Sequence, residues 1–488
     1  MIPLSLGEIA HAVGGRVVDA DPATVVRGPA FLDTRAPEPE GLFVAFVGER
    51  ADGHDHAAAA VTAGAAAVLG SRGTGQPGVV VDDVRAALQE LARVVLDRRR
   101  SQQGPDGRPA PLTVVALTGS QGKTSAKDML AHVLADQAPT VATAGSFNNE
   151  LGLPLTVLRT TAETRYLVLE MGARGIGHLT ELCAIARPDV SLVLNVGRAH
   201  IGEFGSQEAI AQAKGEIVEA LDDSTGVAVL NADDPRVSAM EGRTHAPVVL
   251  FGEAAGADVR LSGVALDDLG RPSFDLTALG RTEHVDLRLL GAHQAHNAAA
   301  TVAVARAVGL PLDRVATSLR SLERLSRWRM EVHERADGLV VVNDAYNANP
   351  DSMRSALETL ARMGRERRTV AVLGEMRELG GTAAEEHLAL GRLAAELGID
   401  EVVAVGEGAR GVHDALADLD LPDGTEATTR SRLVPGLDEA VAWLSENVAG
   451  PDVVLVKASR SGRLEQVADR LLADAGSATR PGGEEGRA

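Results

Sequence analysis

One stretch near residue 120 constrains the fold of this chain more than any other. An apolar, β-branched run over residues 112–118 predicts a strand that is buried on both faces of a parallel sheet. Apolar residues recur at helical spacing over 126–134, which predicts a helix there. The turn between the two ends in Gly122, Lys123 and Thr124. A strand, a glycine-containing turn and a helix in this order predict a phosphate-binding loop.

Each part of this loop has a physical role in holding a nucleoside triphosphate. Glycine lets backbone N–H groups converge on phosphate oxygens, and the helix N-terminus adds its partial positive charge. Lys123 is expected to reach the terminal phosphates, and the Thr124 hydroxyl to bind Mg²⁺. Leu117 stands where the first glycine of a full Walker A motif would lie. The residues expected to bind the triphosphate are Gly119, Ser120, Gln121, Gly122, Lys123, Thr124 and Ser125.

Composition argues against several classes of protein. A net charge of −20 disfavours a nucleic-acid partner, which would need a basic face. No window approaches the roughly 20 apolar residues of a membrane span, and the first residues lack the pattern of an export signal. The single cysteine, Cys183, cannot form an intrachain disulfide and is expected to be a small core residue. These features predict a soluble cytoplasmic protein without membrane insertion.

The length of 488 residues and the alternation of strand and helix patterns predict an α/β protein of three units. Residues 1–98 form a compact α/β pattern. Residues 99–111, rich in Ser, Gln, Gly and Pro, read as a linker. The second unit spans 112–322 and the third 323–475. Residues 476–488 have no apolar face and are expected to be a disordered tail.

The second and third units differ in their strand patterns. Apolar and polar residues alternate over 258–290 on either side of Gly270, and this pattern predicts an antiparallel ribbon. A helix is expected to begin near Gln294. The third unit has apolar runs that predict buried strands at 339–342, 369–373, 402–405 and 453–456, with helices between them.

Side chains suited to chemistry follow several predicted strands of the second unit. Glu170 follows the buried run 166–169, and its hard carboxylate oxygens suit a divalent cation. His200 follows the run 190–194. The carboxyl ends of parallel strands are where doubly wound sheets bind their ligands. Taken alone, however, His200 reads as a surface histidine, and Lys214 reads as a solvated helix lysine.

Four motifs in order resemble the central domain of the Mur ligases, the ATP-dependent amide ligases of peptidoglycan synthesis. A fifth resembles their adenine-contacting motif. The five motifs are Thr118-Gly-Ser-Gln-Gly-Lys-Thr124, Glu170-Met-Gly-Ala173, Asn195-Val-Gly-Arg-Ala-His200-Ile-Gly-Glu-Phe-Gly205, Ala213-Lys-Gly-Glu-Ile217 and Gly291-Ala-His293-Gln-Ala-His-Asn297-Ala-Ala-Ala300.

Further motifs resemble one member of that family, the one that adds D-alanyl-D-alanine to UDP-N-acetylmuramoyl-tripeptide. They are Asn343-Asp-Ala-Tyr-Asn-Ala-Asn349-Pro-Asp-Ser-Met353 and Gly374-Glu-Met-Arg-Glu-Leu-Gly380, with Asp33-Thr-Arg35 and 48–54 near the N-terminus. The resemblance implies a small N-terminal α/β domain that binds the UDP-sugar, a central P-loop ATPase-like domain with a parallel sheet, and a Rossmann-like C-terminal α/β domain.

The resemblance also implies site residues, two Mg²⁺ ions with ATP, the two small-molecule substrates just described, and a monomer. Gln294 departs from the family's usual Asn, and Asn343 from a frequent Asp. The implied catalytic residues are Lys123, Glu170, His200 and Lys214. The metal ligands are Thr124, Glu170, His200 and, if it is carbamylated, Lys214. ATP would also contact Asn297, Arg327 and Asp344. The substrates would contact Thr34, Arg35, Asp52, His54, Asn148, Asn149, Tyr346, Asn349, Lys457, Ser459 and Arg460.

Family chemistry implies that the tripeptide carboxylate takes the γ-phosphoryl group of ATP, and that the dipeptide amine then displaces phosphate. Because the implied contacts are spread over three domains, closure about a hinge near 321–326 is expected. Two alternatives are a ligase of the same fold that adds a diamino acid or glutamate, and a nucleotide-binding regulatory module without transfer. The third unit's motifs disfavour the first alternative. Glu170, His200 and Lys214 together disfavour the second, since a switch needs no second metal site.

Overall fold

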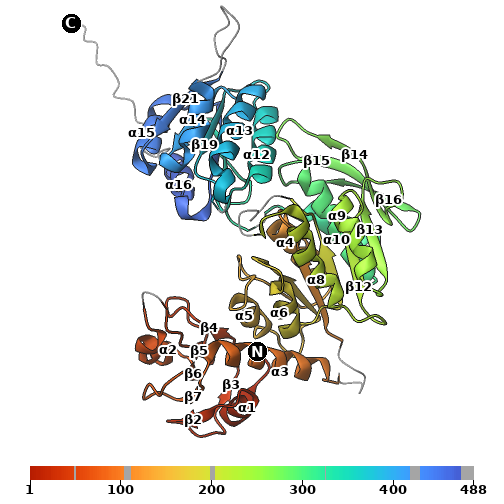
Figure 1. Ribbon diagram of the computed structural model, residues 1–488, viewed down its shortest axis with the longest axis vertical. Coiled ribbons are helices and arrows are strands. Elements are labelled where there is room, and N and C mark those ends of the chain that lie inside the picture. Colours follow the sequence, from red (N-terminus) through yellow and green to blue (C-terminus); the bar gives the residue numbers. More distant parts are fainter. Residues whose placement is uncertain are drawn as a thin grey trace, which may run out of the picture.

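The computed structural model describes residues 1–48, 51–103, 111–197, 204–324, 326–377, 379–417 and 429–473. Within these ranges the chain forms three units that follow one another along the long axis of the molecule (Figure 1). Each unit is built on its own sheet. A small antiparallel pair, β1 (Leu4–Ser5) with β3 (Val25–Val26), adds to the first unit. The predicted α/β class is confirmed.

The first unit is a sheet in the order β2-β7-β6-β5-β4, in which β2 is antiparallel to its neighbour and the other pairs are parallel. Ser5 and Glu8 form the capping box at the start of α1 that their spacing suggests. The elements are α1 (Leu6–Ala12), β2 (Arg16–Val18), β4 (Ala30–Phe31), β5 (Leu42–Val44), η1 (Gly53–His56), α2 (Ala57–Thr62), β6 (Ala67–Gly70), β7 (Gly78–Val80) and α3 (Val84–Arg100).

Helix α3, which the apolar pattern of the sequence did not reveal, joins the first unit to the second. It continues to Arg100, whereas a linker was expected from residue 99. Arg99 is only 2% exposed, and its guanidinium donates hydrogen bonds to the carbonyls of Thr161 and Thr164. Apolar residues of α3 share one core with those of the second unit. This shared packing stabilises the helix beyond residue 98, where the first unit was expected to end. Residues 104–110 of the predicted linker, and the tail 476–488, lie outside the described residues.

The second unit has a sheet in the order β16-β15-β14-β13-β12-β11-β8-β10-β9. The strands β8 to β14 pair in parallel with their neighbours, and β14 to β16 form the antiparallel ribbon predicted from the sequence. The strands are β8 (Thr113–Thr118), β9 (Thr140–Ala142), β10 (Tyr166–Glu170), β11 (Val190–Val193), β12 (Val227–Asn231), β13 (Val248–Gly252), β14 (Val259–Leu266), β15 (Pro272–Ala278) and β16 (Arg281–Asp286).

The helices of this unit cover both faces of the parallel part, as expected for a doubly wound sheet. Cys183 is a buried core residue, as predicted, and burial raises the pKa of its thiol to about 12. The helices are α4 (Lys123–Ala135), α5 (Gly152–Val157), α6 (His178–Ile185), α8 (Gln207–Glu219), α9 (Pro235–Ser238), η2 (Ala239–Arg243), α10 (His293–Ala307) and α11 (Leu312–Ser321).

The third unit has a sheet in the order β17-β18-β22-β19-β20-β21, parallel except for β17. The four buried strands were predicted, but the edge strands β17 and β21 are mostly half-buried or exposed and have no apolar run to reveal them. The elements are β17 (Glu331–Glu334), β18 (Val340–Asp344), α12 (Pro350–Met363), β19 (Thr369–Leu373), η3 (Gly380–Thr382), α13 (Ala383–Glu396), β20 (Glu401–Val405), η4 (Glu407–Ala409), α14 (Arg410–Ala417), β21 (Arg430–Val434), α15 (Leu437–Asn447), β22 (Val453–Lys457), η5 (Arg460–Gly462) and α16 (Glu465–Ala473).

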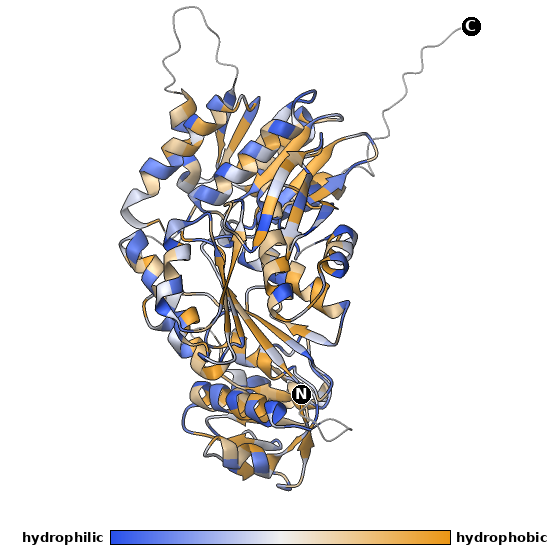
Figure 2. Ribbon diagram, turned by 90° about the vertical axis from the view of Figure 1, so that its right-hand side faces the viewer, coloured by the Kyte–Doolittle hydropathy of each residue, from blue (hydrophilic) through white to orange (hydrophobic). Residues whose placement is uncertain are grey.

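Hydrophobic residues concentrate in the strands, whereas the helices carry hydrophilic residues on much of their surface (Figure 2). This distribution is expected for sheets covered by amphipathic helices. Among the helices of the described ranges, none is both long and apolar enough to cross a lipid bilayer.

Candidate active site

A cleft of about 930 Å³ lies between the second and third units. One wall holds the phosphate loop, Glu170, Lys214 and the first turn of α10. The opposite wall holds residues that follow β18 and β22 of the third unit. The wall of the second unit is made by the carboxyl ends of its parallel strands, which is where this kind of sheet binds its ligands.

The phosphate loop has the predicted strand–turn–helix form between β8 and α4. Gly122 caps α4 with a left-handed φ of 78°, and a Cβ there would lie 2.8 Å from Oδ1 of Asn297. Asn195 braces the loop, because its Oδ1 accepts hydrogen bonds of 3.0 Å from the backbone N–H groups of Ser120 and Gln121. The amine of Lys123 donates to the carbonyl of Gly119 in its own loop, at 2.8 Å. The lysine is therefore held at the loop that it is expected to serve.

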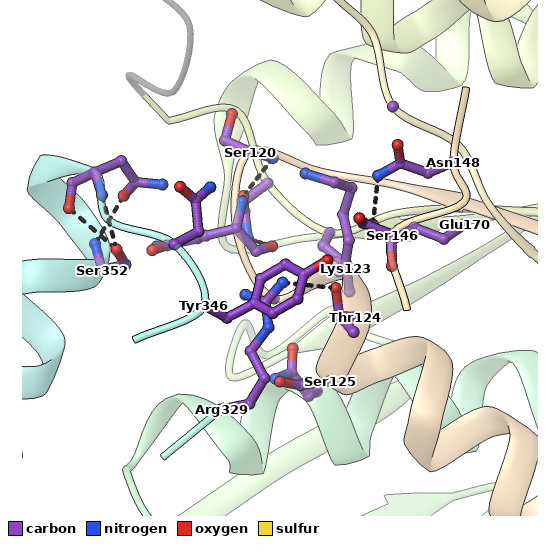
Figure 3. Close-up of a pocket in the computed structure, with 18 of the residues that line it drawn as sticks. Ser120, Lys123, Thr124, Ser125, Ser146, Asn148, Glu170, Arg329, Tyr346 and Ser352 are labelled. Atoms are coloured by element: carbon purple, nitrogen blue, oxygen red, sulfur yellow. Dashed lines mark hydrogen bonds between the residues drawn. The ribbon is translucent and has the colours of Figure 1, made fainter. Parts of the chain in front are cut away.

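Glu170 and Asn148 meet at the floor of the cleft (Figure 3). The Glu170 side chain is almost fully buried, and its Oε1 accepts a hydrogen bond of 2.8 Å from Nδ2 of Asn148. Its Oε2 is also buried but has no hydrogen-bond partner among the described residues. A buried carboxylate oxygen without a partner is costly unless a cation or another ligand binds it. Oδ1 of the neighbouring Asn149 instead accepts hydrogen bonds from the backbone N–H groups of Leu151 and Gly152, just before and at the start of α5.

Lys214 is not a solvated helix lysine, contrary to what the sequence suggested for this residue alone. It lies on α8, is only 4% exposed, and lines the cleft. Burial, and to a lesser extent the charge of Lys123, holds the pKa of the Lys214 amine well below its usual value. Its side chain therefore faces the same space as the phosphate loop and Glu170.

The first turn of α10 forms another part of the same wall. Asn297 donates a hydrogen bond of 2.9 Å to Oε1 of Gln294, so the two amides are fixed against each other. His293 lies within 3.1 Å of the Ser355 hydroxyl, a contact between α10 and α12. Burial lowers the pKa of His293 to about 4, so its ring is neutral at pH 7. A neutral ring can share this hydrogen bond across the junction between two units.

A buried ion pair stands at the wall of the third unit. The amine of Lys457 donates to Oδ2 of Asp344 at 2.6 Å and to the carbonyl of Asn347 at 2.9 Å. The other oxygen of Asp344 accepts from the backbone N–H of Met330, at 3.1 Å. β18 and β22 are parallel neighbours in which Asp344 and Lys457 lie opposite each other. Strand pairing therefore brings the two charges together at the carboxyl edge of the sheet.

The segment between the second and third units brings Arg329 into the cleft, whereas the sequence had indicated Arg327. Arg327 is exposed and lies beside the Trp328 ring, outside the cleft lining. The Arg329 guanidinium lies over the Tyr346 ring at 4.2 Å and donates to the Thr124 hydroxyl (Figure 3). The two arginines lie only two positions apart in a segment without regular periodicity, so the sequence offered no signal to choose between them.

The expected UDP-sugar contacts of the first unit do not line this cleft. Arg35 points into solvent and pairs with Asp33. Thr34 lies between these two residues in the sequence. His54 is buried, with Nδ1 2.6 Å from Asp52 and Nε2 accepting from the backbone N–H of Ser71. With both ring nitrogens engaged, His54 is a structural part of its loop in this conformation.

The remaining expected residues are divided between the cleft and its surroundings. Tyr346, Asn349 and Arg460 line the cleft. The Asn349 side chain also caps α12. Ser459 lies behind the lining, where its hydroxyl accepts from the backbone N–H of Arg377. His200 lies outside the described residues.

Comparison with known proteins places this arrangement in a family. A sequence profile described as the Mur ligase middle domain matches residues 117–305, and one described as "Mur ligase, glutamate ligase domain" matches residues 328–460. A UDP-N-acetylmuramoyl-tripeptide–D-alanyl-D-alanine ligase of Mycobacterium tuberculosis (strain ATCC 25618 / H37Rv) is 45% identical, over 97% of this chain and 98% of that protein. The chain belongs to the Mur ligase family.

Solved structures of Mur ligases agree with the whole architecture. A crystal structure of MurF from Acinetobacter baumannii matches with a TM-score of 0.82 at 31% identity, covering 96% of this chain and 99% of that one. MurF from Thermotoga maritima, solved in complex with ADP, matches with a TM-score of 0.75 at 30% identity, covering 92% and 98%. The Mur ligase architecture predicted from the motifs is therefore confirmed.

Proposed function

We propose that this Mur ligase joins D-alanyl-D-alanine to UDP-N-acetylmuramoyl-tripeptide, using ATP, in the synthesis of the peptidoglycan precursor. The observation that carries the proposal is the cleft itself. It brings a phosphate loop, a buried carboxylate and a buried lysine of one unit opposite cationic groups of another. One oxygen of that carboxylate has no hydrogen-bond partner among the described residues. Full-length similarity to ligases named for this reaction supports the choice of substrates.

In the proposed reaction a carboxylate oxygen of the tripeptide attacks the γ-phosphorus of ATP, and ADP leaves. The amine of D-alanyl-D-alanine then attacks the acyl phosphate carbon, loses a proton, and displaces inorganic phosphate. Lys123 stabilises the charge on the transferring phosphoryl group. Arg329 and the Lys457–Asp344 pair supply further polar groups from the facing unit. Positioning and electrostatics dominate such a transfer.

The residues of the cleft fit Mg²⁺ bound together with the nucleotide. No cluster of three or more His, Cys, Asp or Glu side chains that could hold a metal occurs within the described ranges. Mg²⁺, however, commonly uses one or two carboxylates together with substrate phosphates and water. The Thr124 hydroxyl would supply a protein ligand for the ion at the phosphates. Oε2 of Glu170, which has no hydrogen-bond partner among the described residues, would help to hold a second ion, together with His200 and a carbamylated Lys214. When bound, Mg²⁺ neutralises phosphate charge.

Lys214 is suited to carbamylation. Carbamate forms when an uncharged amine attacks CO₂ and loses a proton, and burial favours the uncharged amine of Lys214. The product is an anionic oxygen ligand, whereas an ammonium group would repel a nearby cation. This chemistry supports a metal-ligand role for Lys214.

The remaining assignments complete the proposal. Asn297 would contact the adenine, Asp344 the ribose, and Thr34, Arg35, Asp52 and His54 the UDP-sugar. Asn148, Asn149, Tyr346, Asn349, Lys457, Ser459 and Arg460 would contact the peptide substrates. The domains would span 1–98, 112–322 and 323–475, in a cytoplasmic monomer.

Phosphate release from ATP tests the function. The purified protein is supplied with UDP-N-acetylmuramoyl-tripeptide and, separately, with D-alanyl-D-alanine, a diamino acid or glutamate. We expect phosphate release, and a product of the mass of the pentapeptide, only with D-alanyl-D-alanine. Equal or faster release with another amine would assign the chain to a different reaction of the family. Absence of release with every amine would favour a regulatory nucleotide-binding role.

A further inference from the structure

Helix α8, which carries Lys214, is held on a second side by a residue outside the cleft. Arg243, the last residue of η2, lies across this helix. Its Nη1 donates a hydrogen bond of 3.1 Å to the carbonyl of Ala211, and its Nη2 donates one of 2.9 Å to the carbonyl of Gln212. Its Nε donates to Oε1 of Glu219 at 2.9 Å. One planar guanidinium therefore contacts α8 at two adjacent backbone carbonyls and at one side chain near the end of the helix.

The two carbonyls are those that close the helical turns around Lys214. In an α-helix the N–H of each residue bonds to the carbonyl four positions earlier, so Ala211 and Gln212 accept from Gly215 and Glu216. These two residues directly follow Lys214. A shift of Arg243 would therefore be transmitted to the turn that points the lysine into the cleft.

Gly215 is what allows the guanidinium to approach. A Cβ at Gly215 would lie 1.8 Å from Nη1 of Arg243 and 2.2 Å from its Cζ, far inside van der Waals contact. Gly215 has no left-handed backbone angle that would otherwise require glycine. The glycine in the Ala213–Ile217 motif thus has a steric explanation, the close passage of Arg243.

A second residue of the same helix holds its other side. The buried carboxylate of Glu216 accepts hydrogen bonds from the backbone N–H groups of Gly177 and Thr180, at 2.6 and 3.0 Å. These groups belong to the first turn of α6. Contacts to α6 on one side and to η2 on the other leave α8 little freedom to turn or slide.

We propose that Arg243 is a positioning residue that, together with Gly215, sets the placement of Lys214 in the cleft. The inference rests on the proposed function, because it treats Lys214 as a residue whose position controls the rate of transfer. Arg243 itself is not among the residues that line the cleft, and its hydrogen bonds within the described residues go to α8.

Gly215→Ala and Arg243→Ala test the inference. Alanine is a better helix former than glycine, so helix propensity alone would leave Gly215→Ala at least as stable as the parent. Displacement of Arg243 should instead lower kcat on the order of 10- to 100-fold, because small misplacements of a catalytic group are expensive. The KM for ATP should stay unchanged, since the phosphate loop is untouched. Hydrogen exchange in the unliganded protein should accelerate at the amides of Gly215 and Glu216.

Arg236→Ala, in α9, is a matched control, because Arg236 also contacts helix α8. Arg236 pairs with Glu208 at 3.1 Å near the start of α8 but donates no hydrogen bond to a backbone carbonyl of that helix among the described contacts. This variant should keep both the parent kcat and the parent exchange rates. Parent-like kcat in Gly215→Ala and Arg243→Ala, or a raised KM for ATP in place of a lowered kcat, would overturn the inference.

These measurements distinguish failure of the proposed ligase function from failure of the positioning role of Arg243. If the parent protein does not ligate D-alanyl-D-alanine, the proposed function falls, while hydrogen exchange still measures whether Arg243 holds the turn. If the parent ligates and exchange at Gly215 and Glu216 is the same in all variants, only the role of Arg243 falls.

Discussion

The guanidinium of Arg329 donates a hydrogen bond of 3.0 Å to the hydroxyl of Thr124, across the junction between the second and third units. Thr124 is the hydroxyl expected to bind Mg²⁺ with the nucleotide. A cation at that oxygen repels a guanidinium, so nucleotide binding should release Arg329. Once released, Arg329 is well placed to contact phosphate oxygens, which it can bind in a bidentate manner.

Arg329→Ala should therefore lower kcat/KM for ATP by about 10²–10³, the usual cost of losing one preorganised contact to developing charge. Arg327→Ala serves as the matched control, because Arg327 is exposed and lies outside the cleft. We expect that control to retain nearly the parent value in the same phosphate-release assay. A larger loss in Arg327→Ala than in Arg329→Ala would instead support Arg327, which the motifs imply, as the nucleotide-binding arginine.

Lys123→Ala should abolish ligation. Lys123 lies within its own phosphate loop, and its loss removes the cation aimed at the β- and γ-phosphates. The expected cost is at least about 10²–10³ in kcat. Steady-state phosphate release measures it, with Lys127→Ala as a control on the same helix. Near-parent turnover in Lys123→Ala would remove the loop from the mechanism.

Lys214→Ala should lose activity that added formate or a short carboxylate partly restores. A small anion can occupy the space of the missing side chain and supply an oxygen in place of a carbamate. The assay compares activity over a range of formate concentrations in the variant and the parent, at fixed ionic strength. Full activity in Lys214→Ala without formate would show that the lysine has only a packing role.

Domain closure should be visible at Trp328, which stacks on Tyr346 with ring centroids 6.5 Å apart and lies under the Arg460 guanidinium. The chain has two tryptophans, so Trp443→Phe leaves Trp328 as the single fluorescent reporter. An ATP analogue and the UDP-tripeptide together should change its emission. The same ligands should reduce the radius of gyration measured by small-angle scattering. An unchanged radius and unchanged emission would contradict closure about the segment near 321–326.

Arg99→Ala should destabilise the connection between the first and second units. The change removes the Arg99 donor from the Thr164 carbonyl, whereas the Thr161 carbonyl keeps the backbone N–H of Thr164 as a donor. A buried carbonyl left unsatisfied costs about 1–3 kcal/mol. Urea unfolding should show a lower midpoint. Arg98→Ala is the control on the same helix, because its exposed pair with Glu8 is worth about 0–1 kcal/mol. Equal midpoints for the two variants would contradict a structural role for Arg99.

The sequence by itself determined the features that depend on local pattern. The strand–turn–helix at Lys123 follows from apolar periodicity and glycine placement, and the buried strands of both large sheets follow from β-branched runs. The ordered motifs were sufficient to identify the family, because each motif keeps its internal spacing and its place along the chain. Cys183 as a core residue was likewise evident from its apolar neighbours.

Only the tertiary structure decided what depends on contacts between distant segments. The contact of Arg329 with Thr124 depends on how the irregular segment turns that guanidinium. The burial of Lys214, the free oxygen of Glu170 and the passage of Arg243 over Gly215 each depend on residues far away in sequence. A side chain's type and spacing do not specify its neighbours in space. The neighbours set desolvation, pairing and pKa, and so the chemistry that the side chain can perform.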